Sequence, residues 1–413
     1  MYSDRVTASQ IDLTERQLAG HRAIAPYRLQ RHTVEECDDM VKRLATAVDE
    51  GGNQKRKLTG DERAFVRNER ILGKIDWNYW RERYSYLIRD PIEGGGLGRF
   101  DHLWESQIEI MRIVNRAEEE AYDAFLAGDP SDGILIVIHK ARQLGASMLA
   151  EDLLWHRVTT TEHLRALIAS VEGEKTRLLY DRGERILNNL PWWLRPSIRY
   201  QVKGEHTFFD KLDTIVTLQD AKQTTGLGQG EQWDVSHLTE CASWPYPNVI
   251  EHDFFPTIPQ SPLALSFLES TAQGRGNWWH DFTERVRNGK TRRWRYCFIP
   301  WYIETKKYRA KPPANWQPSD VSLLHAKMVH DTSSEWCGGK SVFLPKEQLY
   351  WYETTRAEYQ EAGKLNLFLT NYASTPEESF QFSGTSAFTH ETIEWARLMA
   401  GRNKAVSYDL VAQ

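Results

Sequence analysis

An apolar run from Ile134 to Ile138 leads directly into a loop that carries glycine and serine at fixed places. The residues after the run are His-Lys-Ala-Arg-Gln-Leu-Gly-Ala-Ser, ending at Ser147. Gly145 and Ser147 match the second glycine and the hydroxyl residue of the phosphate-loop pattern G-x-x-x-x-G-K-[ST]. In that pattern, backbone amides surround nucleotide phosphates and the hydroxyl holds Mg²⁺. The sequence therefore predicts a buried strand, a phosphate loop and a helix in succession.

Two positions of this loop depart from the pattern. Lys140 replaces the first glycine, and Ala146 replaces the lysine. The positive charge that phosphates require must then come from Lys140 at the strand end and from Arg142, whose guanidinium can contact a phosphate as a fork. The predicted nucleotide-binding residues of the loop are Lys140, Ala141, Arg142, Gln143, Leu144, Gly145, Ala146, Ser147 and Met148. The alternative is an ordinary strand-to-helix turn, which is common in α/β proteins.

Composition excludes several classes of protein. With 413 residues and 40% hydrophobic content, the chain can bury one large α/β core with an appended subdomain, or two to three modest domains. A net charge of -5 excludes a uniformly basic protein that coats nucleic acid, so any DNA contact should be focal. The four cysteines are scattered and form no C-x-x-C pair, which predicts neither a zinc site nor a disulfide framework. We expect a soluble cytoplasmic protein, because no apolar run approaches the roughly 20 residues of a membrane helix.

Short apolar runs alternate with helical patterns between Phe100 and Pro300. These runs are Ile134–Ile138, Arg165–Ser170, Thr214–Leu218, Trp233–Leu238, Leu263–Leu268 and Arg295–Ile299. Alternation of this kind predicts a largely parallel sheet covered by helices. We expect a helical N-terminal arm over residues 1–57, a core with a helical lead-in over 58–300, and a lid or linker region over 301–413.

A second strand ends in a carboxylate. The run Trp233–Leu238 continues into Thr239 and Glu240, as a Walker B strand continues into its acidic residues. A glutamate at the end of a strand beside the phosphate loop can orient and polarise the water that attacks a phosphate, so Glu240 is the predicted general base. Thr239 stands where an aspartate usually holds Mg²⁺, and its hydroxyl can assist only weakly. The alternative for Glu240 is a helix-capping or solvated loop carboxylate.

Two further positions carry polar groups that suit a nucleotide. Gln107 lies about thirty residues before the loop, and its amide can hydrogen-bond both edges of adenine. A surface glutamine on a helix is the alternative. The run Leu263–Leu268 ends in Ser270 and Thr271, whose hydroxyls can hydrogen-bond a phosphate or the attacking water. A plain turn into a helix is the alternative for that segment.

Together these segments resemble the ATPase region of the large terminase subunit, the DNA-packaging motor of tailed bacteriophages. The resemblance covers roughly residues 58 to 390 and rests on the loop Lys140–Ser147 and the segments His237–Trp244 and Glu269–Trp279. It implies an α/β fold of the RecA-like P-loop NTPase class, a mostly parallel sheet flanked by helices, with a helical N-terminal region and a small lid subdomain. Weaker agreement is found at Glu69, Asp76–Trp80, Phe298–Tyr302 and Tyr372–Phe380.

The resemblance also implies an activity and its partners. It implies an ATP hydrolase with ATP and Mg²⁺ as cofactors, Ser147 and Thr239 beside the metal, and Gln107 as the residue that reads adenine. Ser270, Thr271 and Ala272 would couple hydrolysis to movement. Several subunits would form a homo-oligomeric ring on the portal protein and drive double-stranded DNA into the procapsid, while a small terminase subunit recognises the genome. The implied location is the host cytoplasm, transiently at the procapsid portal.

The chain departs from the family's pattern in two ways. Leu227 stands between two glycines where relatives often place an arginine, which leaves Arg142, Arg177 or Arg182 as candidates to stabilise the transition state. Family members also continue into a nuclease domain with clustered aspartates. After Phe380 only about thirty residues follow, with Asp409 as their one aspartate, so we expect no nuclease activity from this chain.

The sequence leaves DNA contacts and two other functions open. Three basic segments can neutralise backbone phosphates, although charge runs are usually solvated faces. These segments are Gln54–Lys57, Lys290–Arg295 and Lys306–Lys311. The replacements at Ala146 and Thr239 also fit a non-catalytic nucleotide-binding assembly protein. A helicase-like remodeller would use the same core, but helicases of that type need two such cores and one is visible.

Overall fold

A computed structural model of the chain describes residues 29–48, 54–202, 205–222, 226–228 and 230–380. The helices within these residues are α2 (Val34–Ala45), α3 (Gly60–Ile75), α4 (Trp77–Tyr84), α5 (Glu105–Ala127), α6 (Ala146–Thr160), α7 (Gly173–Asn189), α8 (Trp278–Arg287), α9 (Asp320–Thr332), α10 (Lys346–Glu361), α11 (Leu365–Asn371) and α12 (Pro376–Ser379). The strands are β1 (Tyr86–Ile88), β2 (Leu97–Arg99), β3 (Ile134–Lys140), β4 (Arg165–Ser170), β5 (Ile198–Val202), β6 (His206–Phe209), β7 (Thr214–Asp220), β8 (Val235–Thr239), β9 (Leu265–Ser270) and β10 (Trp294–Ile299).

An eight-stranded sheet forms the centre of the molecule, in the order β10-β3-β9-β8-β4-β7-β6-β5. The six strands from β10 to β7 pair in parallel, whereas β6 and β5 continue the sheet antiparallel at one edge. All six predicted apolar runs are strands, and they are the six parallel ones. The predicted α/β class, a mostly parallel sheet flanked by helices, is confirmed. The antiparallel edge and the small β1-β2 hairpin were not expected from the sequence.

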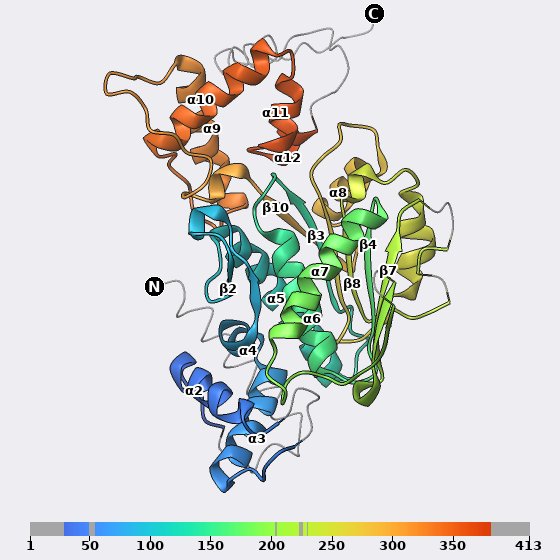
Figure 1. Cartoon of the computed structure of the whole chain (residues 1–413). Coiled ribbons are helices and arrows are strands. Elements are labelled where there is room, and N and C mark those ends of the chain that lie inside the picture. Colours follow the sequence, from blue (N-terminus) through green and yellow to red (C-terminus); the bar gives the residue numbers. More distant parts are fainter. Residues whose placement is uncertain (1–28, 49–53, 203–204, 223–225, 229, 381–413) are drawn as a thin grey trace, which may run out of the picture.

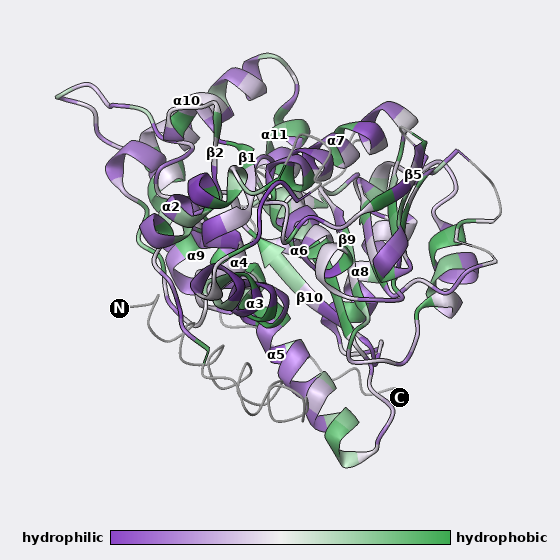
Figure 2. Cartoon of the chain, turned by 60° about the horizontal axis from the view of Figure 1, so that its bottom comes forward, coloured by the Kyte–Doolittle hydropathy of each residue, from purple (hydrophilic) through white to green (hydrophobic). Residues whose placement is uncertain are grey.

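Each face of the sheet is covered by its own hydrophobic cluster. Side chains alternate along a strand, so Ile134, Ile136 and Ile138 of β3 face α5, α6 and α7, while Leu135 and Val137 face the side of α8. A strand that is buried on both faces needs a continuous apolar run, which explains why these strands were visible in the sequence. Figure 2 shows hydrophobic strand residues at the centre and hydrophilic turns on outer helices such as α3.

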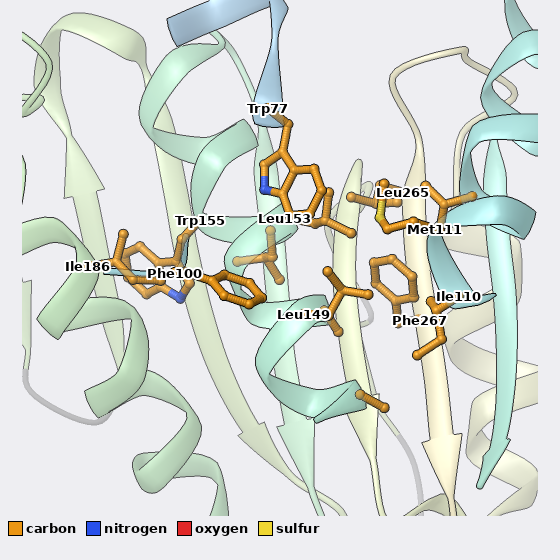
Figure 3. Packing of buried hydrophobic residues seen from close by; sticks show 14 of the residues in the cluster. Trp77, Phe100, Ile110, Met111, Leu149, Leu153, Trp155, Ile186, Leu265 and Phe267 are labelled. Carbon is orange, nitrogen blue, oxygen red and sulfur yellow. The ribbon is translucent and has the colours of Figure 1, made fainter. Parts of the chain in front are cut away.

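Helix α6 packs tightly on the sheet below the phosphate loop. Leu149 and Leu153 of α6 lie against Phe267 and Leu265 of β9, as Figure 3 shows. Leu149 and Phe267 are fully buried, and burial of a leucine or phenylalanine side chain stabilises a fold by about 1.5–3 kcal/mol. On the other side of α6, Trp155 packs against α7, where Gly183 leaves the space for its indole ring. The start of α6 is therefore held in a fixed position beside β3 and β9.

Helices α9 to α12 gather at one end of the molecule, and α2 and α3 lie at the opposite end (Figure 1). Both N-terminal helices begin with a capping box, Thr33 with Glu36 in α2 and Thr59 with Glu62 in α3. Helix α2 lies within the stretch where a helical arm was expected, and α3 and α4 lie within the expected helical lead-in. Residues 1–28 of the predicted arm and residues 381–413 of the predicted lid region lie outside the described residues. No helix in the described part of the chain is long and apolar enough to cross a membrane.

His139 joins the central sheet to the C-terminal helices. The Ser379 hydroxyl of α12 donates to the carbonyl of Pro376, so it accepts a hydrogen bond from His139 Nε2 at 2.9 Å. His139 Nδ1 then accepts from the Tyr296 hydroxyl at 2.9 Å. The ring is fully buried, and this burial lowers the pKa of His139 to about 3. A neutral histidine therefore connects β3 to α12.

A methyl group at Gly183 should destabilise the α6-α7 contact. A Cβ atom there would lie 1.7 Å from an indole atom of Trp155, which is fully buried and cannot move aside. We expect Gly183→Ala to lower the free energy of unfolding by about 1–3 kcal/mol or more through overpacking. Gly60→Ala is the control, because a Cβ at Gly60 meets nothing within 4 Å. Thermal unfolding of both variants checks this, and a wild-type midpoint for Gly183→Ala would contradict the packing.

The buried neutral state of His139 predicts a loss of stability in acid. Its pKa is lower in the folded chain than the unfolded value of 6.5, so the unfolded chain binds more protons as the pH falls below 6.5. At pH 5 this costs on the order of 2 kcal/mol, and His139→Gln should remove part of that cost. Thermal midpoints at pH 7.5 and pH 5 would then differ less in His139→Gln than in the wild type. The control is His330→Gln, which changes a partly exposed histidine, and an equal acid shift in both variants would refute the prediction.

Candidate nucleotide-binding site

The phosphate loop lies at the carboxyl edge of the parallel sheet, between the end of β3 at Lys140 and the start of α6 at Ala146. The structure thus has the strand, loop and helix in the predicted order. Gly145 ends the loop in a left-handed conformation, with φ of 71°. A Cβ atom at Gly145 would also lie 2.7 Å from Gln107 Nε2. Both the backbone conformation and this close approach require glycine at position 145.

Four side chains from outside the loop hold its carbonyl groups. The hydrogen bonds run from Tyr308 to Arg142 O, from Lys307 to Gln143 O at 2.8 Å, from Ser106 to Leu144 O at 2.7 Å, and from Gln107 to Gly145 O at 3.0 Å. The donors come from α5 and from the segment that follows β10. Because the carbonyls of four successive residues point to these donors, the peptide groups are oriented with their N–H groups turned the other way.

The amide groups of the loop are free to bind an anion. Within the described residues, no hydrogen bond is made by the backbone N–H of the six successive residues from Gln143 to Met148, while the amides on either side are bonded, Arg142 N to Asn371 O and Leu149 N to Gly145 O. Gln143 and Gly145 have positive φ angles of 53° and 71°. Successive amides in such a conformation form a concave anion site, and the N-terminus of α6 adds a partial positive charge. This arrangement suits the phosphates of a nucleotide.

A buried carboxylate, Glu269 of β9, lies beside the loop. In the sheet it pairs with Ile138 of β3 on one side and Thr239 of β8 on the other. Glu269 Oε1 accepts hydrogen bonds from Thr239 Oγ1 at 2.7 Å and from His237 Nε2 at 3.0 Å. Glu269 Oε2 lies 3.5 Å from Lys140 Nζ and has no hydrogen-bond partner among the described residues. The side chain is fully buried, so its charge is neutralised within the site.

Charge alternates along this buried network. Burial alone would raise the pKa of Glu269, but the charges of Lys140 and His237 hold that pKa well below its usual range. The nearby Ser147 hydroxyl also favours the charged form. Burial would lower the pKa of His237, yet its hydrogen bonds to Glu151 and Glu269 raise that pKa to about 9. His237 is therefore an imidazolium between two carboxylates, with Lys140 at the open end.

The residues around Ser147 fit a magnesium ion that is bound together with a nucleotide. Ser147 is the second residue of α6, and Glu269 Oε2 and the Thr239 hydroxyl offer further oxygen ligands, which Mg²⁺ prefers. In the described part of the chain no group of three or more His, Cys, Asp or Glu side chains forms a ready metal cage. Mg²⁺ usually keeps several waters and is held by one or two carboxylates plus substrate phosphates. The donor set matches that mode of binding.

Glu240 follows β8 directly and adopts a left-handed conformation, with φ of 57° and ψ of 32°. For a residue other than glycine this costs on the order of 1–3 kcal/mol, and such strain concentrates at functional sites. Its carboxylate is half-buried and has no hydrogen bond or ion pair with the described residues. One strand, β9, separates β8 from β3, so Glu240 and the loop lie at the same edge of the sheet.

The segment at the end of β9 connects the turn that carries Glu240 to the strand that enters the phosphate loop. Ser270 pairs with His139 of β3, and its hydroxyl accepts from the backbone N–H of Ala242 at 3.1 Å, two residues after Glu240. Thr271 and Ala272 continue the segment and are buried. Ser270 thus fixes the turn that carries Glu240 relative to the strand that enters the phosphate loop. Its predicted role in coupling stays a prediction.

Gln107 contacts the loop, but both polar atoms of its amide are occupied. Its Oε1 accepts from Trp104 N at 3.0 Å, and its Nε2 donates to Gly145 O. The adjacent crevice, which Met148 also lines, has a volume of about 10 Å³, enough for about one water. To read adenine, Gln107 would have to exchange these bonds for bonds to the base and the crevice would have to open.

The three arginines that could stabilise the transition state lie at different places around the loop. Arg142 is exposed within it, without an ion pair to the described residues. Arg182 is exposed on α7 and lines a cavity of about 170 Å³ with Met148 and Glu151, whereas Arg177 is exposed further toward the start of α7. Leu227 is buried in the cluster on the α8 side of the sheet.

The three basic segments are partly used inside the fold. Arg56 pairs with Glu62, Arg292 with Asp132, Arg295 with Glu120 and Lys307 with Asp90. Trp294 packs against Phe255 and Phe282 in the core. Contact with DNA from these segments stays a prediction.

No part in the nucleotide site was predicted from the sequence for Glu269, His237, Lys307 or Tyr308. One feature of the sequence could have identified Glu269 and His237. Each is an ionisable residue in or next to an apolar strand run, where a charge is costly unless it is paired. Lys307 and Tyr308 had no such feature, because they reach the loop from more than 160 residues further along the chain.

Comparisons with known proteins point to one group of solved structures. No family model matches the chain, and no curated protein matches it. The bacteriophage HK97 large terminase aligns over 72% of this chain and 54% of its own, at 12% identity and a TM-score of 0.47. The large terminase ATPase domain of Thermus phage P74-26 aligns over 60% and 91%, at 13% identity and a TM-score of 0.37. The large terminase of another thermophilic bacteriophage, in complex with ATP-γ-S, aligns over 52% and 49%, at 11% identity and a TM-score of 0.31.

This chain therefore spans about half the length of the HK97 protein. At these identities the likeness concerns the course of the backbone alone, and the chemistry of the site rests on its own residues. In fold, the chain is similar to the large terminases of bacteriophages.

Proposed function

We propose that this chain is an ATP hydrolase of the P-loop class. The free amides of Gln143–Met148 carry this proposal, because their carbonyls are held from behind and their N–H groups face an anion site at the start of α6. Lys140 lies at the same edge and supplies the positive charge that the altered loop pattern lacks at Ala146. The first amides of any α-helix lack an intrahelical partner, which accounts for those from Gly145 to Met148, and the free amides of Gln143 and Leu144 extend this row into the loop. Such amides are costly unless water or a ligand satisfies them.

Each residue of the site has its own role in the proposed hydrolysis. The loop amides and Lys140 bind the β- and γ-phosphates, and Arg142 neutralises charge that develops on them. Glu240 orients the attacking water and accepts its proton while the bond between the γ-phosphorus and the bridging oxygen breaks. Ser147 would hold Mg²⁺, which neutralises charge on the phosphate oxygens when it is bound. The strained backbone at Glu240 fixes its carboxylate at the sheet edge before substrate binds.

The proposed setting is the packaging of a viral genome. The support for it is the order and spacing of the sequence segments Lys140–Ser147, His237–Trp244 and Glu269–Trp279. In that setting the chain would form a homo-oligomeric ring, bind the portal protein and a small terminase subunit in the host cytoplasm, and translocate double-stranded DNA. Hydrolysis would reach the sheet edge and the C-terminal helices through Ser270 and the contacts of the loop with Lys307 and Tyr308.

A non-catalytic nucleotide-binding assembly protein is the second candidate. Ala146 and Thr239 favour it, because each replaces a residue that hydrolysis normally uses. Lys140 and Glu269 weaken this argument, since they bring a cation and a carboxylate to the same side of the sheet. The two candidates differ in turnover and not in nucleotide binding.

Replacing Glu240 with glutamine should stop hydrolysis but leave ATP binding intact. General base catalysis contributes about 10²- to 10⁴-fold, so we expect a loss of that size in kcat, with nucleotide affinity within about twofold of the wild type. The measurement is Mg²⁺-dependent phosphate release over a series of protein concentrations, with and without double-stranded DNA. Turnover that rises with protein concentration would indicate a site completed between subunits.

The control is Glu231→Gln, which changes an exposed carboxylate just before β8. It should leave kcat unchanged. Equal kcat in wild type and Glu240→Gln would refute the role of Glu240. Nucleotide binding without turnover in every condition would favour the assembly protein.

A further inference from the structure

Glu269 has a feature that the proposed function leaves unused. It is fully buried, and its Oε1 atom is satisfied by Thr239 and His237. Its Oε2 atom faces Lys140 Nζ at 3.5 Å and makes no hydrogen bond with the described residues. A buried carboxylate oxygen without a hydrogen bond is costly, and it persists where a ligand or a task compensates. Oε2 pairs only with the charge of Lys140 among the described residues, so it is the oxygen of Glu269 that a second cation can use.

The side chains around Glu269 Oε2 lie where a phosphate loop holds its metal ion. Side chains two residues apart on a strand share a face, so Lys140, Glu269, Thr239 and His237 all project toward α6. Ser147 lies close enough to Glu269 to favour its charged form. Thr239 occupies the place of the usual aspartate, but its hydroxyl donates to Glu269 and is not free to donate elsewhere. The carboxylate that the usual pattern has on β8 is thus found on the adjacent strand β9, at Glu269.

We infer that Glu269 supplies the carboxylate that holds the Mg²⁺ of the bound nucleotide, directly or through a metal-bound water, together with Ser147. This inference rests on the proposed function. Without nucleotide, Lys140 neutralises Glu269; with nucleotide, Lys140 turns to the phosphates and Oε2 is released for the metal. One oxygen thereby serves two cations in turn, and His237 keeps the other oxygen in place throughout.

The rest of the network fixes the orientation of Glu269. His237 donates to Oε1 and to Glu151, which lies one turn after Ser147 on α6. The imidazolium therefore links the helix that carries Ser147 to the strand that carries Glu269. Glu151 and Glu269 are both buried carboxylates on His237, but only Glu269 contacts Lys140. Glu151 is thus a matched control for the loss of one carboxylate from the network.

The test is the gain in affinity that Mg²⁺ gives to a non-hydrolysed nucleotide. The affinity for ATPγS is measured by calorimetric titration in excess Mg²⁺ and in EDTA, and the ratio of the two Kd values is the gain. In Glu269→Gln we expect the gain to fall by about 10- to 100-fold, the scale for losing a partner of a bound metal. Affinity in EDTA should stay equal to the wild type or increase, because Lys140 is freed for the phosphates.

A second variant tests whether a carboxylate on β8 can replace the one on β9. The double variant Glu269→Gln with Thr239→Asp places an acidic side chain on β8, and we expect it to recover most of the Mg²⁺ gain. Glu151→Gln should keep the wild-type gain even where it lowers the thermal midpoint. A purely structural role for Glu269 would instead give equal losses in Glu269→Gln and Glu151→Gln and no recovery in the double variant, which would overturn the inference.

The possible outcomes separate this inference from the function on which it rests. If the wild type binds no nucleotide in either condition, the proposed function fails and the inference with it. If the wild type shows a Mg²⁺ gain that Glu269→Gln retains, only the inference fails. Should Glu269→Gln not fold, Glu269→Asp takes its place, because retraction of the carboxylate by one methylene must still reduce the gain; an unchanged gain in that variant overturns the inference equally.

Discussion

The buried contact between Lys140 and Glu269 is the interaction on which the site depends. Both residues are at most 8% exposed, and each charge stabilises the other in the interior. The pair joins the end of β3 to the neighbouring strand β9 at the point where the phosphate loop begins. It sets the position of the lysine that the loop pattern lacks at Ala146. The loop has its lysine at Lys140 instead of position 146, and the acidic side chain is Glu269 instead of residue 239. These two departures from the usual pattern occur together in one ion pair.

A second constraint acts on the loop from the side of the C-terminal helices. Lys307 and Tyr308 hold two loop carbonyls, and Asn371 accepts from the Arg142 amide. His139 reaches α12 through Ser379 at the same edge. These contacts fix the orientation of the peptide groups in the loop. They also make the C-terminal region a structural partner of the loop, because Asn371 of α11 contacts Arg142 and Ser379 of α12 contacts His139 through direct hydrogen bonds.

The sequence was sufficient for the parallel part of the sheet, because buried parallel strands need continuous apolar runs. It failed at β5, where four of the five residues, Arg199–Val202, are exposed and only antiparallel pairing to β6 forms the strand. It also placed the strand, the loop, Ser147 and Glu240 in the correct local structure. The role of Glu269 could not be read from the sequence, since two of its partners lie 30 and 32 residues away on β8 and the third lies at the start of the loop. Pairing across parallel strands is a property of the fold and not of local spacing.

The proposed function requires the loop from Lys140 to Ser147 to bind the phosphates of a nucleotide. The most direct measurement is the affinity of the purified chain for ATPγS, compared between wild type and Lys140→Gln at the same Mg²⁺ concentration. We expect the wild type to bind ATPγS and the loss of the lysine charge to weaken binding at least about tenfold, because a charge-assisted contact to phosphate is lost. Equal affinity in the two proteins, in a variant with a wild-type thermal midpoint, would contradict it.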